Sequence, residues 1–582
     1  MGAAGSIDSP LKLGYCTAEQ IGELIASIGP EYEQYSQMSI KAGVDGEVIE
    51  EFDCEGFETF LKKDFGIENT VHRKKMVAQF RKRKDADLRK LSRVAPASIV
   101  PVEDAERSAL DMGGLDGYVQ TEISLSNVLL AKLDFLGDSF DSEGMNNTSR
   151  ASLRGTSHRI TYNKLLGPED VVLSNITFGP ACSRTMRAFQ RAGPRQLIHF
   201  NPQRVRAAIV TCGGLCPGLN NVIRDIYHSL TQLYGCEHVM GIRGGYAGFY
   251  DASLEPLRLT DELVAGIHHQ GGTLLGSSRG GFDLEKIMGF LERNGVNQLY
   301  VIGGDGTHRG AHRVAMECLA RGLNVAVAGV PKTIDNDIGL LDRTFGFKTS
   351  IEAAQAAIQS AKVEATCNLP RGVGIVKLMG RSSGFLAAHA ALASGEVDLC
   401  LVPEVPIVLD GPKGLLPHLK KRIQEQGHAV VVVAEGAGEE VLGASAETDA
   451  SGNKKLPKIG EWIKEQIDRF FREEGMPATI KYIDPSYMIR SVPANAADSL
   501  YCSVLGQNAV HGAMAGYTAF TVGLINNRVA YIPIPMLTAV SPRVMDPCGR
   551  TWERVLAETR QPNTVDPEKA KLLINRSNKT VI

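Results

Sequence analysis

The 582-residue chain lacks the features of several large protein classes. No uninterrupted apolar stretch approaches the about 18 residues of a membrane-spanning helix, and the N-terminus has no secretory signal pattern. Its 11 cysteines are scattered and odd in number, which indicates reduced thiols in a cytoplasmic protein rather than a disulfide framework. A net charge of −3 gives no general attraction to nucleic acid or membranes. The 43% hydrophobic and 22% charged residues are ordinary for a globular protein.

Residues 14–86 have the pattern of a small helical domain. Thr17 can cap a helix whose apolar positions recur at helical spacing: Ile21, Leu24, Ile25 and Ile28. Asn69 can open a last helix that turns Met76, Val77 and Phe80 inward. This order of short helices, with DGEVIEEFD, LKKDFGI and VHRKKMVAQFRKRK, resembles a SAM domain. The resemblance implies a five-helix bundle and a role in self-association or in docking to a protein partner.

Two features of this N-terminal part have more than one interpretation. The last helix carries seven basic side chains, which form a solvated face or a surface for an acidic partner or lipid: Arg73, Lys74, Lys75, Arg81, Lys82, Arg83 and Lys84. Residues 1–6 match the N-myristoylation pattern. Because one acyl chain binds weakly and no polybasic stretch follows immediately, no stable membrane anchoring is expected.

Residues 87–160 are expected to be a connector. The stretch 137–159 is polar and has no aliphatic periodicity, so part of the connector is predicted to be disordered. The preceding TEISLSNVLLAKLDFLG is compatible with a short ordered element, but its pattern does not place that element.

From about residue 161 the chain alternates between strand-like and helix-like segments. VRAAIVT (205–211) ends in CGGLCPGLN, NQLYVI (297–302) ends in GGDGT, and NVAVAGV (324–330) ends in PKTIDND. Helical patterns follow the first two turns, at 220–230 and 309–320. Short apolar runs with Gly-rich turns and helices predict a doubly wound parallel α/β sheet. Such sheets bind ligands at the carboxyl ends of their strands, so the three turns are expected to converge on one cleft.

The turn GGDGT (303–307) is compatible with phosphate binding. Its glycines let backbone N–H groups approach phosphate oxygens, and the following helix adds positive potential. Asp305 could hold Mg²⁺ that bridges phosphates. A tight strand-to-helix turn with an Asp cap explains the pentapeptide equally well. The sequence matches neither a Walker A loop nor the GxGxxG dinucleotide fingerprint.

Two other Gly-rich loops strengthen the phosphate interpretation. Gly213 and Gly214 follow the first strand directly, and Pro217 and Gly218 complete that loop. The loop GGTLLGSSRGG (271–281) contains Arg279, whose guanidinium can neutralise a phosphate. Several such loops at one end of a sheet predict a phosphate cradle.

The turn PKTIDND (331–337) carries two carboxylates that are two residues apart. In an extended segment Asp335 and Asp337 would point the same way, with Ile334 opposite. Two neighbouring carboxylates repel unless a cation or a proton relieves them. Mg²⁺ at one and a substrate hydroxyl at the other would do so, an arrangement suited to phosphoryl transfer to an alcohol. Asp-Asn-Asp is also ordinary turn chemistry.

Seven motifs in order connect this region to a known family: GGLCPGLN, GGTLLGSSR, GGDGT, PKTIDND, KLMGRSSGF, VPE and KYIDPSYMIR. From about 165 to 545 the chain resembles the 6-phosphofructokinases, above all the long plant and protist ATP-dependent branch, in which RAGPRQLIHFNP precedes the first strand. The resemblance implies two doubly wound three-layer α/β subdomains within residues 161–582. It also implies a glycolytic transferase: a kinase that uses ATP and Mg²⁺ to convert fructose 6-phosphate to fructose 1,6-bisphosphate. The resemblance further implies that the enzyme is a homotetramer under allosteric control. It names no effector.

The resemblance assigns roles to individual residues. Asp335 would be the base for the sugar 1-hydroxyl, Thr333 would contact the transferring phosphoryl group or the sugar, and Arg381 would balance phosphoryl charge. Asp305 and Asp337 would serve Mg²⁺. The nucleotide side would be lined by Gly214, Tyr246, Arg279, Gly280, Gly304, Asp305, Gly306 and Thr307. The sugar phosphate would contact, besides Thr333, Asp335 and Arg381, a further set: Ile334, Met379, Gly380, Glu404, Lys481, Tyr487, Met488, Ile489 and Arg490.

Some of these roles have plainer alternatives, and the donor needs its own argument. Glu404 can instead cap a helix, and Lys481 and Arg490 can be surface charges. Family members that use pyrophosphate tend to carry Asp where this chain has Gly306, and the glycine leaves space for ATP. A lysine at the position of Lys332, by contrast, is common among the pyrophosphate users. ATP is therefore the expected donor and pyrophosphate the alternative. A catalytically dead scaffold predicts lost carboxylates, which this chain retains.

One position departs from the bacterial pattern. Bacterial enzymes supply an arginine across a subunit boundary where this chain has Gly372. The neighbouring Arg371 is one residue out of register, and such a shift in a strand reverses the side-chain face. Arg371 is therefore not assigned to the sugar phosphate.

Overall fold

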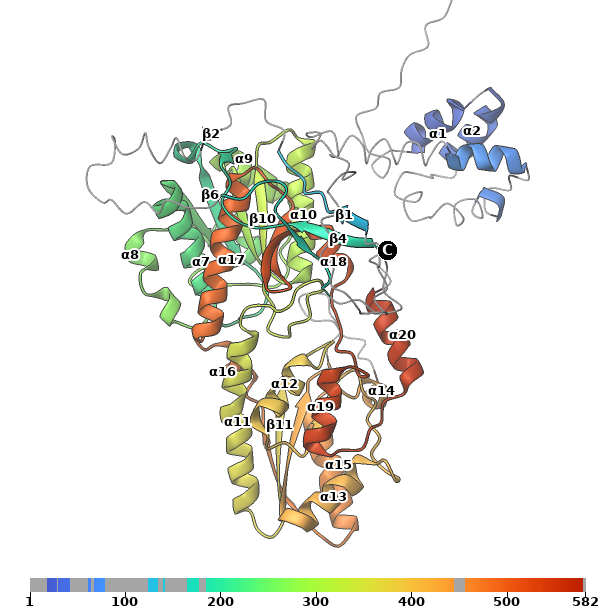
Figure 1. The fold of residues 1–582 in the computed structure, drawn as a ribbon, viewed down its shortest axis with the longest axis vertical. Helices are drawn as coiled ribbons and strands as arrows, with labels where there is room; N and C mark the ends of the chain where they lie inside the picture. The colour runs from blue at the N-terminus through green and yellow to red at the C-terminus, as the bar shows by residue number, and fades with distance from the viewer. Residues whose placement is uncertain are drawn as a thin grey trace, which may run out of the picture. The chain divides into compact units, whose positions relative to one another are not determined.

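The protein forms two compact units, Met1–Gly117 and Tyr118–Ile582 (Figure 1). The computed structural model describes residues 18–28, 30–41, 61–63, 67, 69–78, 124–133, 140–141, 165–176, 185–443 and 456–578. Thr17, Phe80, the myristoylation pattern and the polar stretch from 142 to 159 lie outside these residues.

The first unit contains short helices around a small apolar core. Its described elements are α1 (Ala18–Ala26), the 3-10 turn η2 (Pro30–Tyr32), α2 (Glu33–Lys41) and a helix over residues 70–78. The predicted start of the last helix is confirmed, because Asn69 Oδ1 accepts hydrogen bonds from the N–H groups of Val71 (2.9 Å) and His72 (3.2 Å). The buried core comprises Ile21, Ile25, Tyr32, Leu61, Ile67 and Met76.

The second unit contains a seven-stranded sheet with the order β16-β15-β10-β9-β6-β7-β8. Its strands are β6 (Arg206–Thr211), β7 (His238–Ile242), β8 (Leu257–Arg258), β9 (Gln298–Gly303), β10 (Ala326–Pro331), β15 (Phe520–Ile525) and β16 (Arg528–Pro533). The three strands predicted at 205–211, 297–302 and 324–330 are β6, β9 and β10, and they pair in parallel.

The sheet is not wholly parallel, because β8 and β16 run antiparallel to their neighbours. At β16 the reason is a two-residue hairpin. Asn526 and Asn527 both have positive φ, 50° and 58°. Two consecutive residues of that conformation match the twist of a hairpin, and asparagine tolerates it better than most residues.

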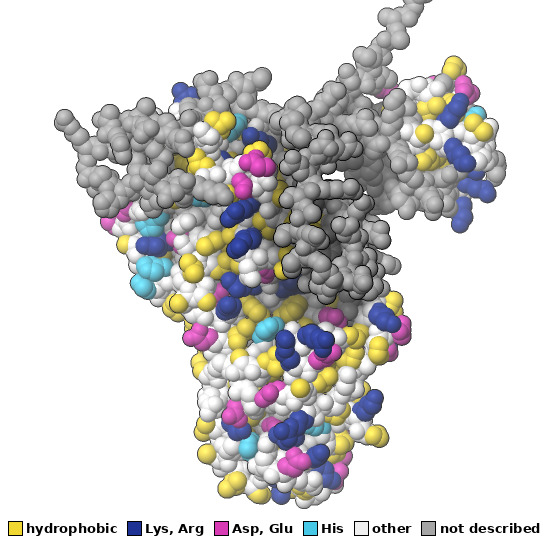
Figure 2. Space-filling model, in the orientation of Figure 1, with side chains coloured by type: hydrophobic (Ala, Val, Ile, Leu, Met, Phe, Trp, Pro, Cys, Tyr) yellow, Lys and Arg dark blue, Asp and Glu magenta, His cyan; other side chains and the backbone are white. Residues whose placement is uncertain are grey.

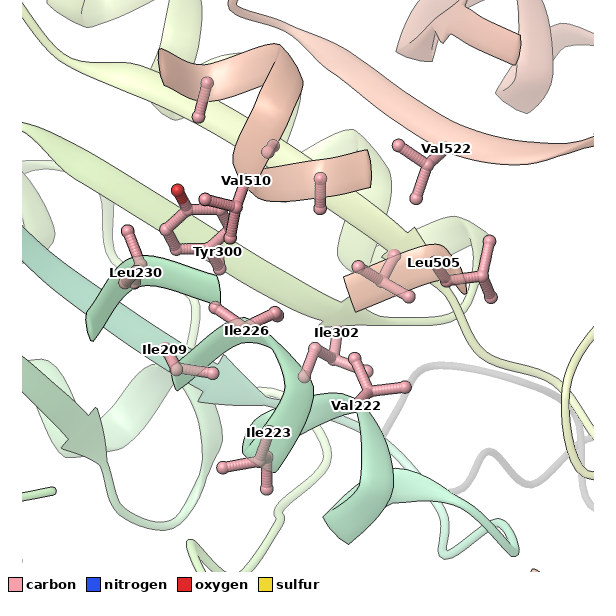
Figure 3. Packing of buried hydrophobic residues seen from close by; sticks show 14 of the residues in the cluster. Ile209, Val222, Ile223, Ile226, Leu230, Tyr300, Ile302, Leu505, Val510 and Val522 are labelled. Atoms are coloured by element: carbon pink, nitrogen blue, oxygen red, sulfur yellow. The ribbon is translucent and has the colours of Figure 1, made fainter. Parts of the chain in front are cut away.

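Helices cover both faces of this sheet. One face packs on α7 (Leu219–His228), the π-helical turn η4 (Ser229–Tyr234) and α17 (Ala496–Met514), and Figure 3 shows their apolar side chains meeting those of β6 and β9. The other face packs on α9 (Leu284–Asn294) and α10 (Asp305–Ala320). Each fully buried Val, Leu or Ile contributes about 1.5–3 kcal/mol, so this double cover holds the strand ends in place.

A second, four-stranded parallel sheet has the order β12-β13-β11-β14. Its strands are β11 (Gly372–Leu378), β12 (Leu399–Leu401), β13 (His428–Ala434) and β14 (Thr479–Ile483). One face packs on α11 (Phe347–Cys367), α12 (Phe385–Ser394) and α19 (Arg550–Thr559). The other packs on α13 (Leu415–Gln426) and α15 (Ile459–Glu473). Two α/β subdomains within one unit are therefore present, as the sequence predicts.

The chain crosses between the two sheets three times. It leaves the first sheet after β10 and enters the second along α11, the long helix beside the lower sheet in Figure 1. It returns through α16 (Ser486–Arg490) and α17 to β15 and β16, and then continues through α18 (Ile534–Ala539) to α19 and α20 (Pro567–Asn578). The turn after β10 and the segment after α18 thus both lie at crossings.

Part of the segment predicted as a connector belongs to the second unit. β1 (Ser124–Asn127) pairs in parallel with β4 (Thr185–Gln190), which also pairs with β3 (Val171–Leu173), and β2 (Phe140–Asp141) pairs with β5 (Leu197–Ile198). The N–H of Leu133 donates to Gly516 O at 2.9 Å. Residues 124–133 are therefore the ordered element that the sequence pattern does not place.

The surface of the second unit is mixed in charge. On the face shown in Figure 2, Lys and Arg side chains alternate with Asp and Glu, as the net charge of −3 would suggest. Among the described residues, no helix has both the length and the apolar character needed to cross a membrane.

Candidate active site

The three predicted turns meet at one end of the first sheet. The last pairs of the ladder join Pro331 to Gly303 and Thr211 to Ile302. Beyond them, Lys332 N–H donates to Gly303 O at 2.9 Å. Because β6, β9 and β10 are adjacent and parallel, their carboxyl ends form a single edge. The predicted convergence is confirmed.

The GGDGT turn is largely the first turn of α10. Gly304 is the N-cap with extended backbone, and no side chain caps the helix, so the alternative in which Asp305 is a cap is wrong. Asp305 instead pairs with Arg309 at 3.0 Å. The buried Tyr246 donates its hydroxyl to Thr307 O at 2.7 Å, which places it beneath the turn. A Cβ at Gly306 would meet no described atom within 4 Å.

Lys332 ties the Gly-rich loops together. Its buried ammonium group donates to Gly214 O at 2.7 Å, and burial lowers its pKa, helped by the charge of Arg279. The Arg279 Nη2 atom lies 3.7 Å from where a Cβ of Gly214 would be. The two loops also bond to each other, since Ser277 Oγ donates to Gly213 O at 2.7 Å. Next to Arg279, Gly280 has φ 75°, a conformation suited to glycine.

The acidic segment after β10 is a turn, so the extended conformation considered from sequence is wrong. Asn336 has φ 56°, in the left-handed region. Thr333 Oγ1 accepts the N–H of Asp335 at 3.2 Å and donates to Asp337 Oδ1 at 2.8 Å. This hydroxyl closes the turn, and by bonding to both residues it keeps Asp335 and Asp337 close together.

The two carboxylates are buried and each lies near other acidic groups. Burial raises the pKa of Asp335 well above its usual range, and the charges of Asp337 and Glu435 add to the shift. Burial also raises the pKa of Asp337, and the charge of Asp305 adds to it, against the hydrogen bond from Thr333. Among the described residues, Asp335 Oδ1 has no hydrogen-bond partner. A buried orphaned acceptor of this kind is suited to a ligand donor.

The second subdomain supplies the other wall. Met379, Gly380 and Arg381 follow β11, and the backbone N–H of Arg381 donates to the Asp335 carboxyl group. Ser383 Oγ donates to Asp335 O at 3.3 Å. Met379 is buried in the core of this subdomain. Ile334 packs against the cores of both subdomains, so the acidic turn is seated where they join.

Glu404 and Glu435 have different surroundings, and sequence reasoning selected only the first. Glu404 is buried and accepts the N–H groups of Gly384 (2.9 Å) and Met545 (2.7 Å). It therefore caps α12, the plainer alternative for this residue. Its pKa rises to about 7 because burial outweighs these hydrogen bonds. Glu435 follows β13 directly, and its charge acts on Asp335.

Glu435 was identifiable by the reasoning that found the other turns. HAVVVVA (428–434) is a continuous apolar run that ends in Glu435. In the structure, Leu378 and Ala434 pair at the ends of β11 and β13. Burial raises the pKa of Glu435, while the charges of Lys377 and Arg381 oppose that rise.

The predicted 6-phosphate residues lie in β14 (Lys481) and in α16, which follows it. Tyr487 and Met488 are 73% and 74% exposed, and the Arg490 guanidinium carbon lies 4.7 Å from the Tyr487 ring centre. Lys481 Nζ is 3.9 Å from Glu364. Ile489 is buried in the core, which leaves only its backbone for a ligand.

Gly372 and Arg371 lie at the start of β11, where bacterial enzymes have an arginine for the sugar phosphate. Gly372 opens β11, where a Cβ would clash with Ala365 O at 1.9 Å. Arg371 Nε donates to Pro477 O at 3.1 Å. Arg371 is therefore occupied by a backbone carbonyl on the adjacent segment.

The carboxylates fit a magnesium ion that is bound mainly through its substrate. Among the described residues, no group of three or more His, Cys, Asp or Glu is placed to hold a metal by itself. Mg²⁺ in nucleotide sites takes one or two carboxylates and completes its shell with phosphates and waters. Asp305 and Asp337 match that requirement. They lie close enough together for the charge of Asp305 to raise the pKa of Asp337.

Comparisons with known proteins agree with this geometry. A family model described as Phosphofructokinase matches residues 206–513. The chain is 52% identical over 384 residues to ATP-dependent 6-phosphofructokinase 5, chloroplastic, of Arabidopsis thaliana, covering 66% of this chain and 71% of that protein. It is 50% identical over 383 residues to ATP-dependent 6-phosphofructokinase 7 of the same plant, covering 65% and 78%. The fold is similar to that of pyrophosphate-dependent phosphofructokinase from Marinobacter aquaeolei, with 20% identity, TM-score 0.50, and coverage of 61% and 91%.

Proposed function

This chain belongs to the phosphofructokinase family, and from that membership we propose how its residues carry out the reaction. It is an ATP-dependent 6-phosphofructokinase, a kinase of glycolysis that phosphorylates fructose 6-phosphate to fructose 1,6-bisphosphate. The single observation that carries the mechanism is Asp335 Oδ1, a buried carboxylate oxygen without a hydrogen-bond partner among the described residues, at the junction of the two subdomains.

Asp335 removes the proton from the 1-hydroxyl of the sugar. Its raised pKa, caused by burial and by the charges of Asp337 and Glu435, makes it a stronger base than an exposed aspartate. Thr333 holds the turn closed through Asp337 and faces the transferring phosphoryl group. Arg381, whose backbone already contacts Asp335, supplies guanidinium charge to that group.

The nucleotide lies over the edge formed by the three Gly-rich loops. The uncapped N–H groups at the start of α10 face its phosphates, and Lys332 and Arg279 contribute positive charge. Open space at Gly306 accommodates the ATP chain. Asp305 and Asp337 would hold Mg²⁺, which when bound neutralises charge on the donor phosphates.

The sugar phosphate binds from the second subdomain. Lys481, Tyr487 and Arg490 bind the 6-phosphate, with the backbone of Met488 and Ile489 beside them. Glu435 accepts hydrogen bonds from sugar hydroxyls, which is the role that the sequence assigns to Glu404. This reassignment rests on the charge of Glu435 at Asp335 and on the two backbone N–H groups that occupy Glu404.

The remaining proposals concern organisation. Residues 14–86 form a SAM-like domain that associates with itself or a partner, and 161–582 form the catalytic region. The connector lies within 87–160, outside residues 124–133 and 140–141, which belong to the second unit. The enzyme is a cytoplasmic homotetramer under allosteric control. Support for the separate N-terminal domain comes from its own apolar core.

A coupled assay tests the function directly. Purified enzyme with Mg²⁺ and fructose 6-phosphate is given ATP or pyrophosphate, and fructose 1,6-bisphosphate is measured. We expect turnover with ATP only. In Asp335→Ser, kcat should fall by roughly 10²–10⁴-fold while KM for both substrates changes little. Turnover of that variant near the wild-type rate would remove Asp335 from the role of base, and product formed only with pyrophosphate would contradict the assigned donor.

A further inference from the structure

The segment 541–545, which follows α18, connects the acidic turn to the second subdomain. Near its start, Ser541 Oγ accepts the N–H of Gly339 at 3.0 Å. At its end, the N–H of Met545 donates to Glu404 at 2.7 Å, and Glu404 caps α12. One short piece of chain therefore bonds to the loop of the first subdomain and to a helix start of the second.

Arg543 lies in the middle of this segment and makes most of its contacts with the turn. Its backbone N–H donates to Asp337 O at 2.6 Å. Its guanidinium donates to three carbonyls: Nε to Asn336 O at 3.1 Å, Nη1 to Leu341 O at 2.8 Å and Nη2 to Asp342 O at 3.4 Å. These carbonyls lie at the two ends of the loop 336–342, so one side chain spans both of its ends.

The chemistry of the contact favours arginine. Asn336 is buried and in the left-handed conformation, so its backbone needs support from its surroundings. Buried carbonyls without donors cost free energy, and a guanidinium offers several donors in a fixed fork. A lysine keeps the charge but cannot reach the same set of acceptors. The Arg543 guanidinium carbon also lies 4.8 Å from the ring centre of Phe385, in the first turn of α12.

The charge of Arg543 also reaches the catalytic pair. Burial raises the pKa of Asp337, and the Arg543 guanidinium opposes that rise. Among the described contacts, Arg543 makes none with Asp335, whose hydrogen-bond partners are Thr333, Arg381 and Ser383. Any influence of Arg543 on the base is therefore indirect, through the conformation of the turn.

We propose that Arg543 is a positioning residue for phosphoryl transfer: it locks the acidic turn against the second subdomain, so that Asp335 and Asp337 keep their places when the two subdomains hold the substrates. The inference rests on the proposed function. It adds that the C-terminal segment after α18 is part of the catalytic apparatus, because misplacing a reacting group by about 1 Å can cost about 10²-fold in rate.

Steady-state kinetics of Arg543→Gln and Arg543→Lys test this role. We expect kcat of Arg543→Gln, per folded enzyme counted by circular dichroism, to fall about 10- to 100-fold. KM for fructose 6-phosphate and ATP should stay within about threefold, since their binding groups lie elsewhere. Arg543→Lys should recover part of kcat, because it restores one donor and the charge. A purely structural arginine would lower the folded fraction and leave kcat per folded enzyme unchanged.

Arg195→Gln is the matched control. Arg195 is buried and, like Arg543, donates to backbone carbonyls, those of Gly167 and Arg191, but not at the active site. It should lower thermal stability and keep kcat. The inference fails if kcat of Arg543→Gln stays within twofold of wild type, if Arg195→Gln loses as much, or if both Arg543 variants are unfolded at 10 °C. A wild-type enzyme without ATP-dependent turnover would instead contradict the proposed function.

Discussion

Gly306 is the residue at which donor choice is most directly testable. It occupies the second position of α10, and a Cβ there meets no described atom within 4 Å. Gly306→Asp should therefore fold normally, and an acidic residue in the first turn of a helix is favourable. Its carboxylate would add a negative charge beside the proposed site of the ATP phosphates, and like charges at a separation of about 4 Å repel by about 1–4 kcal/mol. We expect kcat/KM for ATP to fall about 10- to 100-fold.

The control for this prediction is Gly306→Ala, which adds bulk without charge. It should lose less than about threefold in kcat/KM for ATP. Equal losses in the two variants would mean that space, not charge, matters at this position. Unchanged ATP use in Gly306→Asp would remove the residue from donor selection.

Glu435 and Glu404 provide a contrast between a substrate contact and a helix cap. Glu435→Gln should raise KM for fructose 6-phosphate about 10- to 100-fold, because a hydrogen bond to a charged group is worth about 1.5–3 kcal/mol. Its melting temperature should change little. Initial rates across substrate concentration, together with thermal melts, measure both effects.

Glu404→Gln should show the opposite pattern. Oε1 of its carboxylate accepts the N–H groups of Gly384 and Met545, and Oε2 also faces the Gly384 N–H at 3.0 Å. The amide of glutamine would replace one oxygen with an NH2 donor next to these donors. The melting temperature should therefore fall while KM for fructose 6-phosphate is retained. A raised KM in Glu404→Gln with a normal KM in Glu435→Gln would restore the assignment made from sequence.

Sequence reasoning at the residue scale succeeded where a residue type follows a strand directly. Asp305, Thr333 and Asp335 all lie at the predicted edge for that reason. The family resemblance implied a contact between Glu404 and the sugar, whereas in the structure two N–H groups from distant segments donate to that carboxylate. Gly384 and Met545 are 20 and 141 residues away from it. Partners so remote leave no local pattern.

At the scale of single elements, α17 contains a buried histidine that should make the stability of the fold depend on pH. Its residue His511 is buried, and its Nδ1 lies 2.7 Å from the Tyr234 hydroxyl. Burial, and then the charge of Arg195, lower the His511 pKa to about 3. Below about pH 6.5, the ordinary pKa of histidine, His511 is protonated in the unfolded chain but stays neutral in the folded chain. Stability is therefore complete above about pH 6.5 and is lost as pH falls toward 3, by up to about 1.4 kcal/mol per pH unit.

Urea unfolding at pH 7, 6 and 5 measures this effect. As the pH is lowered from 7 to 5, the unfolding free energy of wild type should fall more steeply than that of His511→Gln. The difference between the two slopes should correspond to the uptake of up to one proton on unfolding. The exposed His238, changed to Gln, is a matched control and should keep the wild-type slope. Parallel slopes for wild type and His511→Gln would show that this histidine is not the responsible group.

The elements themselves were predictable to different degrees. β6, β9 and β10 are continuous apolar runs with Gly-rich ends, so local sequence alone predicts them. β1 is four residues of Ser, Leu, Ser and Asn, and its partner β4 lies about 60 residues later. Pairing that depends on a distant edge has no local signature. The acidic turn was misjudged as extended because the left-handed Asn336 is stabilised by Thr344 and Arg543, not by its neighbours.

At the scale of the whole molecule, the division into two units places the active site in one of them. Every residue assigned to the active site lies in Tyr118–Ile582, and the first unit has its own buried core. The resemblance of residues 14–86 to a SAM domain suggests that this unit links catalytic oligomers, since several weak contacts on one assembly add in avidity. Catalysis and assembly should therefore be separable by deletion.

Deleting residues 1–86 should leave kcat and both KM values within about twofold of the full chain. The mass measured by light scattering should fall to that of a catalytic tetramer, whereas the full chain grows with concentration because its linked contacts follow mass action. Met76→Asp in the full chain should act like the deletion, because it places a charge in the core of the first unit. If size is the same for all three proteins across concentration, the first unit does not associate with itself, and its role must be docking to a different protein.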